Sequence, residues 1–199
     1  PAHGFAGGSR QAASRFEAFL RDKLRSYANG KANSPCNQQN SFLSPYLHFG
    51  HISPLRLALR VSELSKQEKR ETGAGAVSSG CVAFLEELIV RRELARNFCL
   101  HCDEYDTFAC LPDWAQASLL GHAADSRARS YTYAQLERGE TDDPCWNAAQ
   151  WEMVVTGHMH NYMRMYWCKQ LITWTTEPRT AFEWAVRLNN KFSLDGRDE

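Results

Sequence analysis

The sequence predicts an all-α fold, and three observations lead to this class. Apolar residues recur at every third or fourth position in several segments, which is the spacing of one face of a helix. Alternation of apolar and polar residues, the pattern of a half-buried strand, is scarce, and no strand–helix–strand unit is evident. With 199 residues, of which 43% are hydrophobic and 23% charged, the chain is long enough to bury a core of its own.

The first predicted helix covers residues 11–27 and follows a glycine-rich linker at residues 1–10. The apolar residues that recur at helical spacing in it are Phe16, Phe19, Leu20, Leu24 and Tyr27. The polar stretch at residues 29–41 predicts a loop. Beyond it, Ser44-Pro45 and Ser53-Pro54 each place a capping hydroxyl before a proline at the first position of a helix. We expect a short helix at the first of these pairs, and at the second a helix that runs to about residue 64.

Residues 65–79 are charged at first and then rich in glycine, alanine and serine, which predicts a mobile connection. The remaining predicted helices lie at residues 81–100, 112–123, 133–138, 146–174 and 178–190. The helix at 146–174 is the longest of these and carries four tryptophans, Trp146, Trp151, Trp167 and Trp174. The sequence contains no internal repeat.

Charge and cysteine content narrow the class of protein. The chain has 23 basic and 23 acidic residues, so its overall charge does not indicate a nucleic-acid binder. No apolar run reaches the roughly 18 residues of a membrane span, and no signal peptide opens the chain. Seven cysteines at irregular spacing predict reduced thiols and therefore a location inside a cell. The sequence does not indicate which compartment of the cell this is. Cys99 and Cys102 resemble half of a zinc site, but no second pair follows, so no metal is expected.

The two ends of the chain suggest a piece of a longer protein. The sequence begins with Pro1 rather than Met, and its last residues, LDGRDE, do not have the composition of a tail. We therefore expect a segment cut from a larger chain.

The tryptophans at positions 146, 167 and 174 are the most informative residues of the sequence. On one helix, Trp167 and Trp174 would lie two turns apart, about 10 Å along one face. Large aromatic side chains at this spacing most often fill a core. They could instead form a relay of redox-active rings between a buried cofactor and the surface.

Polar residues at three other places could likewise have either a structural role or a role in binding a ligand. The joint at residues 40–45 offers backbone N–H groups and hydroxyls for a phosphate, although an ordinary helix start is the simpler reading. Glu87 stands among apolar residues, where a carboxylate needs a partner. Arg91, one turn on, would make a structural ion pair; otherwise Glu87 can bind the polar edge of a substrate. Arg164 and Asp195 could pair and hold an electron-rich ring between them.

Five segments of the sequence together resemble the photolyase/cryptochrome superfamily, and class II cyclobutane pyrimidine dimer photolyases most closely. These segments are SPYLHFGHISP, FLEELIVRREL, WNAAQWEMV, HMHNYMRMYW and LNNKFSLDGRD, in the order found in that family. The resemblance implies that residues 1–199 are part of the helical FAD-binding and catalytic domain. It also implies that the amino-terminal Rossmann-like antenna domain and the carboxy-terminal part of the helical domain are missing.

The resemblance implies the light-driven repair of pyrimidine dimers in DNA by a monomeric protein, with electron transfer from reduced FAD to a flipped-out dimer. The residues implied as FAD contacts are Tyr27, Asn40, Ser41, Phe42, Leu43 and Ser44, with Arg164 and Asp195 as an ion pair beside the ring and Asn189 near its N5 atom. The residues implied to face the dimer are Glu87, Asn161 and Met165, with Glu87 hydrogen-bonded to the damaged base. The implied photoreduction chain runs from Trp167, nearest the flavin, through Trp146 to Trp174.

Two other functions stay open from the residues alone. A cryptochrome-like photoreceptor would use the same flavin and tryptophan chain for signalling. A flavin-free helical remnant that acts as an interaction module would need neither. The basic residues that could meet DNA phosphates are scattered, so no phosphate contact is assigned to any one of them.

Overall fold

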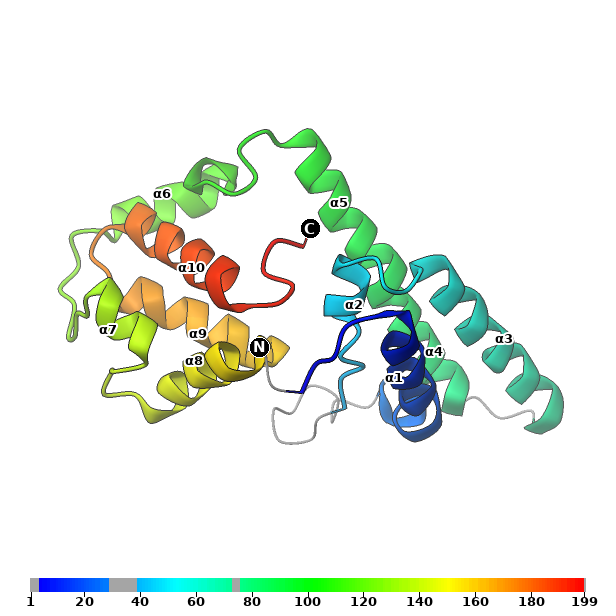
Figure 1. Cartoon of the computed structure of the whole chain (residues 1–199). Coiled ribbons are helices and arrows are strands. Elements are labelled where there is room, and N and C mark those ends of the chain that lie inside the picture. Colours follow the sequence, from blue (N-terminus) through cyan, green and yellow to red (C-terminus); the bar gives the residue numbers. More distant parts are fainter. Residues whose placement is uncertain (1–3, 29–38, 73–75, 199) are drawn as a thin grey trace. The chain divides into compact units, whose positions relative to one another are not determined.

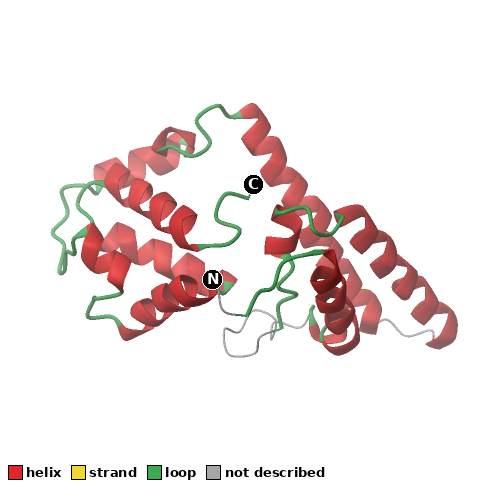
Figure 2. Cartoon of the chain, in the orientation of Figure 1, coloured by secondary structure: helices red, strands yellow, loops and turns green. Residues whose placement is uncertain are grey.

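The computed structural model describes residues 4–28, 39–72 and 76–198, and these residues form helices and loops without a strand (Figure 2). The predicted all-α class is therefore confirmed.

The chain divides into two compact units, each described by itself. The amino-terminal unit is Phe5–Asn97 with Asp198, and the carboxy-terminal unit is Phe98–Arg197 with Gly4. The boundary falls within α5, Arg92–His101 (Figure 1).

The helices of the amino-terminal unit surround a core of aromatic and aliphatic side chains. These helices are α1 (Ser9–Asp22), the 3₁₀ turn η1 (Leu24–Ser26), α2 (Ser44–His48), α3 (Pro54–Thr72), α4 (Ala76–Leu85), the π-helical turn η4 (Glu86–Arg91) and the first part of α5. α1 buries Ala12, Phe16 and Phe19, which recur every three or four residues on one face. Leu57 and Val61 of α3 are fully buried in the same core.

The predicted helix at residues 11–27 is shorter in the structure and ends at Asp22. Lys23 leaves helical geometry, with φ −126°, and the chain continues as the 3₁₀ turn η1. Leu24 nevertheless stays in the core at 1% exposure. Gly80 lets α4 approach this turn, because a Cβ atom on it would lie 1.8 Å from the carbonyl oxygen of Leu24.

The two predicted serine caps have different outcomes. The cap residue of α2 is Leu43, without a side-chain hydrogen bond, so the predicted capping role of Ser44 is wrong. Ser53 does cap α3, since its hydroxyl accepts from the backbone N–H of Arg56 at 3.4 Å. α3 continues to Thr72 and α4 begins at Ala76. Most of the connection expected at residues 65–79 is thus helix, because residues 65–72 are largely good helix formers.

The carboxy-terminal unit has its own core. Its elements are η5 (Phe108–Cys110), α6 (Asp113–Gly121), α7 (Tyr133–Arg138), α8 (Pro144–Thr156), α9 (Asn161–Trp174) and α10 (Pro178–Phe192). The buried apolar residues of this core are Leu136, Trp146, Ala149, Met153, Met159, Trp167, Leu171, Trp174 and Leu188. α7 has its predicted bounds, because Thr132 and Gln135 form a capping box at its start and Gly139 ends it in the left-handed conformation.

The single long helix predicted at residues 146–174 is wrong, because two helices lie there. Gly157 ends α8 with φ 72°, a conformation that glycine adopts without strain. His160 then caps α9, its ring Nδ1 accepting from the backbone N–H of Tyr162. The break lets α8 and α9 pack against each other. Asp143 joins them further, since it caps α8 and accepts a hydrogen bond from the Tyr166 hydroxyl of α9.

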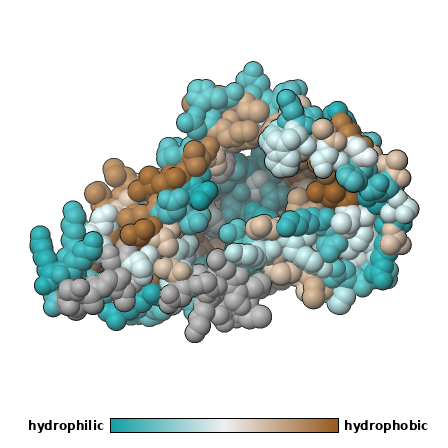
Figure 3. All heavy atoms as spheres, turned by 180° about the vertical axis from the view of Figure 1, so that it is seen from behind, coloured by the Kyte–Doolittle hydropathy of each residue, from teal (hydrophilic) through white to brown (hydrophobic). Residues whose placement is uncertain are grey.

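Apolar side chains also reach the surface along the run from α4 to α5 (Figure 3). The large exposed apolar residues of this run are Val82, Ile89, Val90, Leu94, Phe98 and Leu100. None of the described helices combines the length and the apolar composition that a membrane crossing requires.

Candidate functional site

Trp146 of α8 contacts both tryptophans of α9. Its ring stacks on that of Trp167 with 5.9 Å between centroids and 6° between planes. It meets Trp174 edge to face, with centroids 5.4 Å apart and 69° between planes. The ring contacts therefore run from Trp167 through Trp146 to Trp174, and they join residues far apart in sequence through the packing of two helices.

Two hydrogen bonds fix the orientation of the stacked rings. Trp146 Nε1 donates to the backbone carbonyl of Trp167 at 3.0 Å. Trp167 Nε1 donates to Oε1 of Gln150 at 2.9 Å, and Gln150 Nε2 donates to the carbonyl of Glu137 at 3.1 Å. Gln150 is fully buried, and sequence reasoning missed it. An amide one turn after Trp146, and so on the same face of the helix as that ring, was the available signal, because buried amides need partners.

Packing in a core and a series of ring contacts suited to an electron relay are compatible roles for the three tryptophans. The exposed fractions are 0% for Trp146, 2% for Trp167 and 7% for Trp174, and all three belong to the core of the carboxy-terminal unit. Tyr131 packs edge to face on Trp174 with 5.0 Å between centroids. The rings fill a core and also form a continuous series of contacts whose most exposed tryptophan is Trp174.

Arg164 of α9 lies at the centre of a polar network. Its guanidinium is 3.5 Å from Oδ1 of Asp195, so the expected pairing of these two residues is present. The same group donates to Oδ1 of Asn189 at 3.4 Å and to the hydroxyl of Ser193 at 3.3 Å. Ser193, which sequence reasoning missed, in turn donates to Asp195 at 2.8 Å. The side chains of Arg164 and Asp195 are 33% and 11% exposed, so solvent screens the pair only in part.

The loop after α10 holds Asp195 in this network. Asn189 Nδ2 donates to the carbonyl of Gly196 at 2.9 Å, and the backbone N–H of Leu194 donates to the carbonyl of Gly157 at 2.8 Å. A Cβ atom on Gly196 would lie 2.5 Å from the backbone oxygen of Asn189. The sequence therefore needs glycine directly after Asp195 for this loop to close.

Asn161 and Met165 lie one turn apart on α9, and both are exposed. The exposed fraction of Met165 is 53%. An exposed methionine on a helix that also carries Arg164 is available to contact a ligand, since its thioether adapts to many shapes. The role of both residues toward a substrate stays a prediction.

Glu87 lies in the π-helical turn η4, and its surroundings differ from the expected ones. Arg91 pairs with Glu86 at 3.4 Å rather than with Glu87, because a π turn brings residues five apart onto one face. Among the described residues Glu87 has no ion-pair partner, and its side chain is exposed rather than buried. The expected structural ion pair is thus wrong, and the carboxylate of Glu87 faces solvent. Short π turns inside helices are frequent at functional sites.

Tyr27 packs edge to face against Phe19 and Phe84, with centroids 5.5 Å and 5.8 Å away. Burial and, to a smaller extent, the negative charge of Glu87 together raise the pKa of its phenol to about 12. Tyr27 and Glu87, expected to contact the cofactor and the substrate respectively, are therefore electrostatic neighbours in the amino-terminal unit.

Residues 40–44 lead into α2. The backbone carbonyl of Asn40 accepts from Lys23 Nζ at 3.3 Å. Ser41 and Phe42 line a cavity of about 280 Å³ beside α1. Leu43 is 1% exposed and anchors the segment in the core, and Ser44 is the first residue of α2. Two basic residues, Arg15 and Lys23, and one acidic residue, Asp22, also line this cavity.

The predicted site residues thus form separate groups. In the carboxy-terminal unit, one group joins Arg164, Asn189 and Asp195, and another joins the three tryptophans. In the amino-terminal unit, Tyr27 lies near Glu87, and residues 40–44 border the cavity. Sequence resemblance assigned these residues to one cofactor and one substrate, and that assignment stays a prediction.

Comparison with known proteins gives one consistent result. The chain is 48% identical to a deoxyribodipyrimidine photo-lyase from Methanothermobacter thermautotrophicus over 194 residues, which are 98% of this chain and 40% of the relative. The enzyme of that name from Arabidopsis thaliana is 45% identical over 182 residues, 92% of this chain and 35% of the relative. The one from Potorous tridactylus is 41% identical over 191 residues, 96% of this chain and 34% of the relative. The chain therefore spans well under half the length of these curated relatives.

A solved structure agrees on the fold. A bacterial class III photolyase from Agrobacterium tumefaciens matches 92% of this chain and 38% of its own, with a TM-score of 0.61 and 20% sequence identity. No protein-family model matches the chain.

Proposed function

Because this chain belongs to the photolyase/cryptochrome family, we propose that it is part of the flavin-binding, catalytic region of an enzyme that repairs pyrimidine dimers in DNA with light. The observation that carries this proposal is the 48% identity to a deoxyribodipyrimidine photo-lyase over 98% of the chain. An identity this high, over nearly all of the chain, supports the carry-over of reaction class as well as fold.

The chemistry of the side chains fits a flavin dinucleotide. Arg164 and Asn189 present guanidinium and amide groups, which suit the polar edge of an isoalloxazine ring, and Asp195 orients Arg164. When bound and reduced, FAD would supply the electron that splits the dimer under light. Asp195 and Ser193 hold Arg164 in place, so that Arg164 would present a fixed positive charge to a bound flavin.

The tryptophans would carry an electron inward from a reductant in solution, such as a thiol, which would reduce Trp174 again at the outer end of the series. In this proposal the electron passes from Trp174 to Trp146 and then to Trp167, the order of their ring contacts. Burial of all three rings protects an oxidised intermediate from water. This path prepares the cofactor for repair and takes no part in dimer splitting itself.

The exposed side chains that the resemblance assigns to the dimer have the chemistry to recognise a base. A base that is flipped out of the duplex is recognised by hydrogen bonds to its polar edges and by apolar contacts. Glu87 offers a carboxylate without a protein partner among the described residues, and Met165 and Asn161 offer an apolar and an amide contact. DNA that contains pyrimidine dimers is therefore the proposed partner.

The proposal is tested by mixing the reduced, FAD-loaded protein with dimer-containing DNA and measuring dimer loss under blue light and in the dark. We expect dimer loss in the light only. Glu87→Gln should lower repair strongly, whereas Glu86→Gln, its neighbour in the same π turn, should leave repair unchanged. Absence of light-dependent repair by the loaded protein would overturn the proposal, and photoreduction without affinity for dimers would indicate a photoreceptor instead.

A further inference from the structure

A groove of about 470 Å³ lies between α1 and the first half of α3, wholly within the amino-terminal unit. The most buried residues of its lining are Phe16 of α1 and Ile52, which are 4% and 8% exposed. The residues assigned to the flavin and to the pyrimidine dimer lie elsewhere in the described chain. This α1–α3 groove is therefore a surface that the proposed function does not use.

Two leucines of α3 border the α1–α3 groove. Leu55 and Leu59 lie one turn apart, and their exposed fractions are 67% and 57%. Single exposed leucines are ordinary on a protein surface. These two, however, lie beside a concave apolar floor, so one patch contains both an apolar ridge and an apolar hollow. A surface of this kind gains free energy when ridge and hollow are removed from water together.

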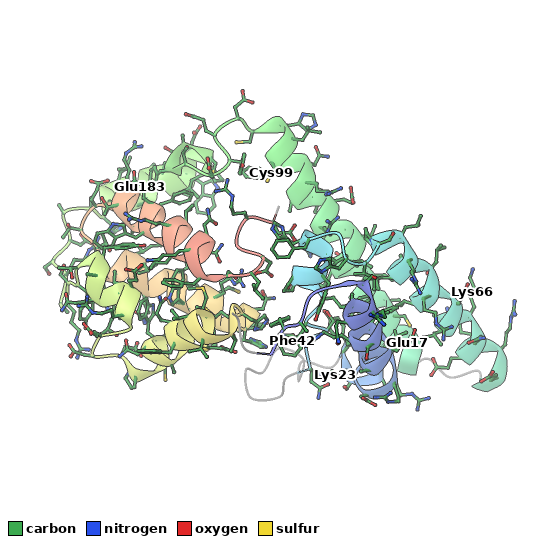
Figure 4. The ribbon with its side chains drawn as sticks, viewed as in Figure 1. Glu17, Lys23, Phe42, Lys66, Cys99 and Glu183 are labelled. Carbon is green, nitrogen blue, oxygen red and sulfur yellow. The ribbon has the colours of Figure 1, made fainter. Side chains whose placement is uncertain are left out.

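The charged residues that line the groove are two bases and two acids. Arg60 pairs with Glu63 along α3 at 3.8 Å, an exposed contact that solvent weakens. The other two are Arg56 of α3 and Glu17 of α1, which Figure 4 labels, and neither has an ion-pair partner among the described residues. A surface whose charges balance disfavours nucleic acid and other partners of one charge sign.

The order of the charges along α3 suits a second copy of the same helix. Arg56 and Glu63 are seven residues apart, which is two turns or about 10 Å along one face. A two-fold axis midway between them aligns two α3 helices antiparallel and places Arg56 of each copy opposite Glu63 of the other. The axis then passes beside Leu59, so leucines meet at the centre and ion pairs flank them. Such self-complementarity is what a two-fold symmetric interface requires.

We propose that the α1–α3 groove is the interface of a symmetric homodimer, in which the α3 helices of two copies pack antiparallel and bury Leu55 and Leu59. Two reciprocal ion pairs between Arg56 and Glu63 set the register of the helices. The exposed apolar residues involved are few, so the interface is small and the homodimer reversible. This inference is independent of the proposed function, and it departs from the monomer that the resemblance implies.

The test measures the oligomeric state by sedimentation velocity, over a concentration series from micromolar to millimolar. The groove variants are Arg56→Glu, Glu63→Arg and Leu59→Gln. All three residues are exposed, so the variants should keep their fold, and circular dichroism checks their helix content. Lys69→Glu is the matched control, because it reverses an exposed charge on the same helix outside the groove.

We expect the unaltered protein and Lys69→Glu to form homodimers with the same dissociation constant. Leu59→Gln should raise this constant at least about 10-fold, because symmetry removes one central leucine from each copy. Arg56→Glu and Glu63→Arg should each raise it at least about 10-fold, because like charges then face each other at two places. An equimolar mixture of these two charge variants should dimerise again, since every pair in the mixed dimer joins opposite charges.

Three outcomes would overturn the inference. The first is a monomer throughout the concentration series. The second is a homodimer that all three groove variants leave unchanged; its loss in Leu94→Gln would assign it to the exposed apolar run from α4 to α5 instead. The third is a mixture of Arg56→Glu and Glu63→Arg that stays monomeric, which would exclude the antiparallel register.

Discussion

The indole of Trp146 stacks on that of Trp167 with 5.9 Å between centroids and 6° between planes, and its Nε1 donates to the Trp167 carbonyl. The same ring touches Trp174 at 5.4 Å. Trp146 is thus the only one of the three tryptophans that contacts both others within the described chain. Its removal tests the proposed path more directly than removal of either end.

Trp146→Phe should slow flavin photoreduction strongly and leave repair by pre-reduced protein unchanged, because phenylalanine is much harder to oxidise than tryptophan. The variant should also lose about 1–3 kcal/mol of unfolding free energy, since a buried ring becomes smaller. Photoreduction is followed by absorbance under blue light. Trp151→Phe is the control, since Trp151 is 54% exposed on the same helix. Equal photoreduction in the two variants would contradict the path.

Gln150→Leu should lower the unfolding free energy by about 1–3 kcal/mol, because Trp167 Nε1 and the Glu137 carbonyl both lose their partner in a buried place. Urea unfolding followed by circular dichroism measures the change. Gln67→Leu, at an exposed position of α3, should change stability by less than about 0.5 kcal/mol. A loss at Gln150 no larger than at Gln67 would show that the amide does not support the tryptophans.

Gly196→Ala should destabilise the loop that carries Asp195, because the new Cβ atom would lie 2.5 Å from the Asn189 backbone oxygen. We expect a loss of about 1–3 kcal/mol in unfolding free energy, together with weaker flavin binding. Gly121→Ala is the matched control, since no atom lies within 4 Å of its added Cβ in α6. That change should be neutral, or stabilising by up to about 1 kcal/mol. Equal thermal stability of the two variants would contradict the role of Gly196.

The raised pKa of Tyr27 predicts a stability that falls at high pH. The folded protein keeps the phenol protonated up to a pKa of about 12, while the unfolded chain ionises near the ordinary value of 10. Below pH 10 both states hold the proton and stability is unaffected; as pH rises from 10 toward 12, only the unfolded state loses it, and unfolding becomes more favourable. The loss should approach about 2 kcal/mol.

Urea unfolding at several pH values compares the unaltered protein with Tyr27→Phe, which cannot titrate at this position. The unaltered protein should lose more stability between about pH 10 and about pH 12 than the variant does. Glu87→Gln should lower the pKa of Tyr27 only in part, because burial is its larger cause. Parallel pH curves for the unaltered protein and Tyr27→Phe would show that the phenol is not shifted.

The sequence by itself determined the helical class and most of the helices. α7 and α10 begin where predicted, because a capping hydroxyl or a proline at a helix start acts on its own few residues. Apolar spacing likewise identified the buried face of α1, since the helical period depends only on local backbone hydrogen bonds. The pairing of Arg164 with Asp195 was anticipated as well, although its role beside a flavin stays a prediction.

Tertiary structure alone decided how these helices meet. The sequence from residue 146 to residue 174 was interpreted as one helix, so the break at Gly157 between α8 and α9 was not predicted. Without that break Trp146 cannot stack on Trp167. The π turn that separates Glu87 from Arg91, and the burial of Gln150 against Trp167, also left no periodic signal. Local rules fix which residues share a helix face, whereas the contact of two faces depends on packing between segments distant in the chain.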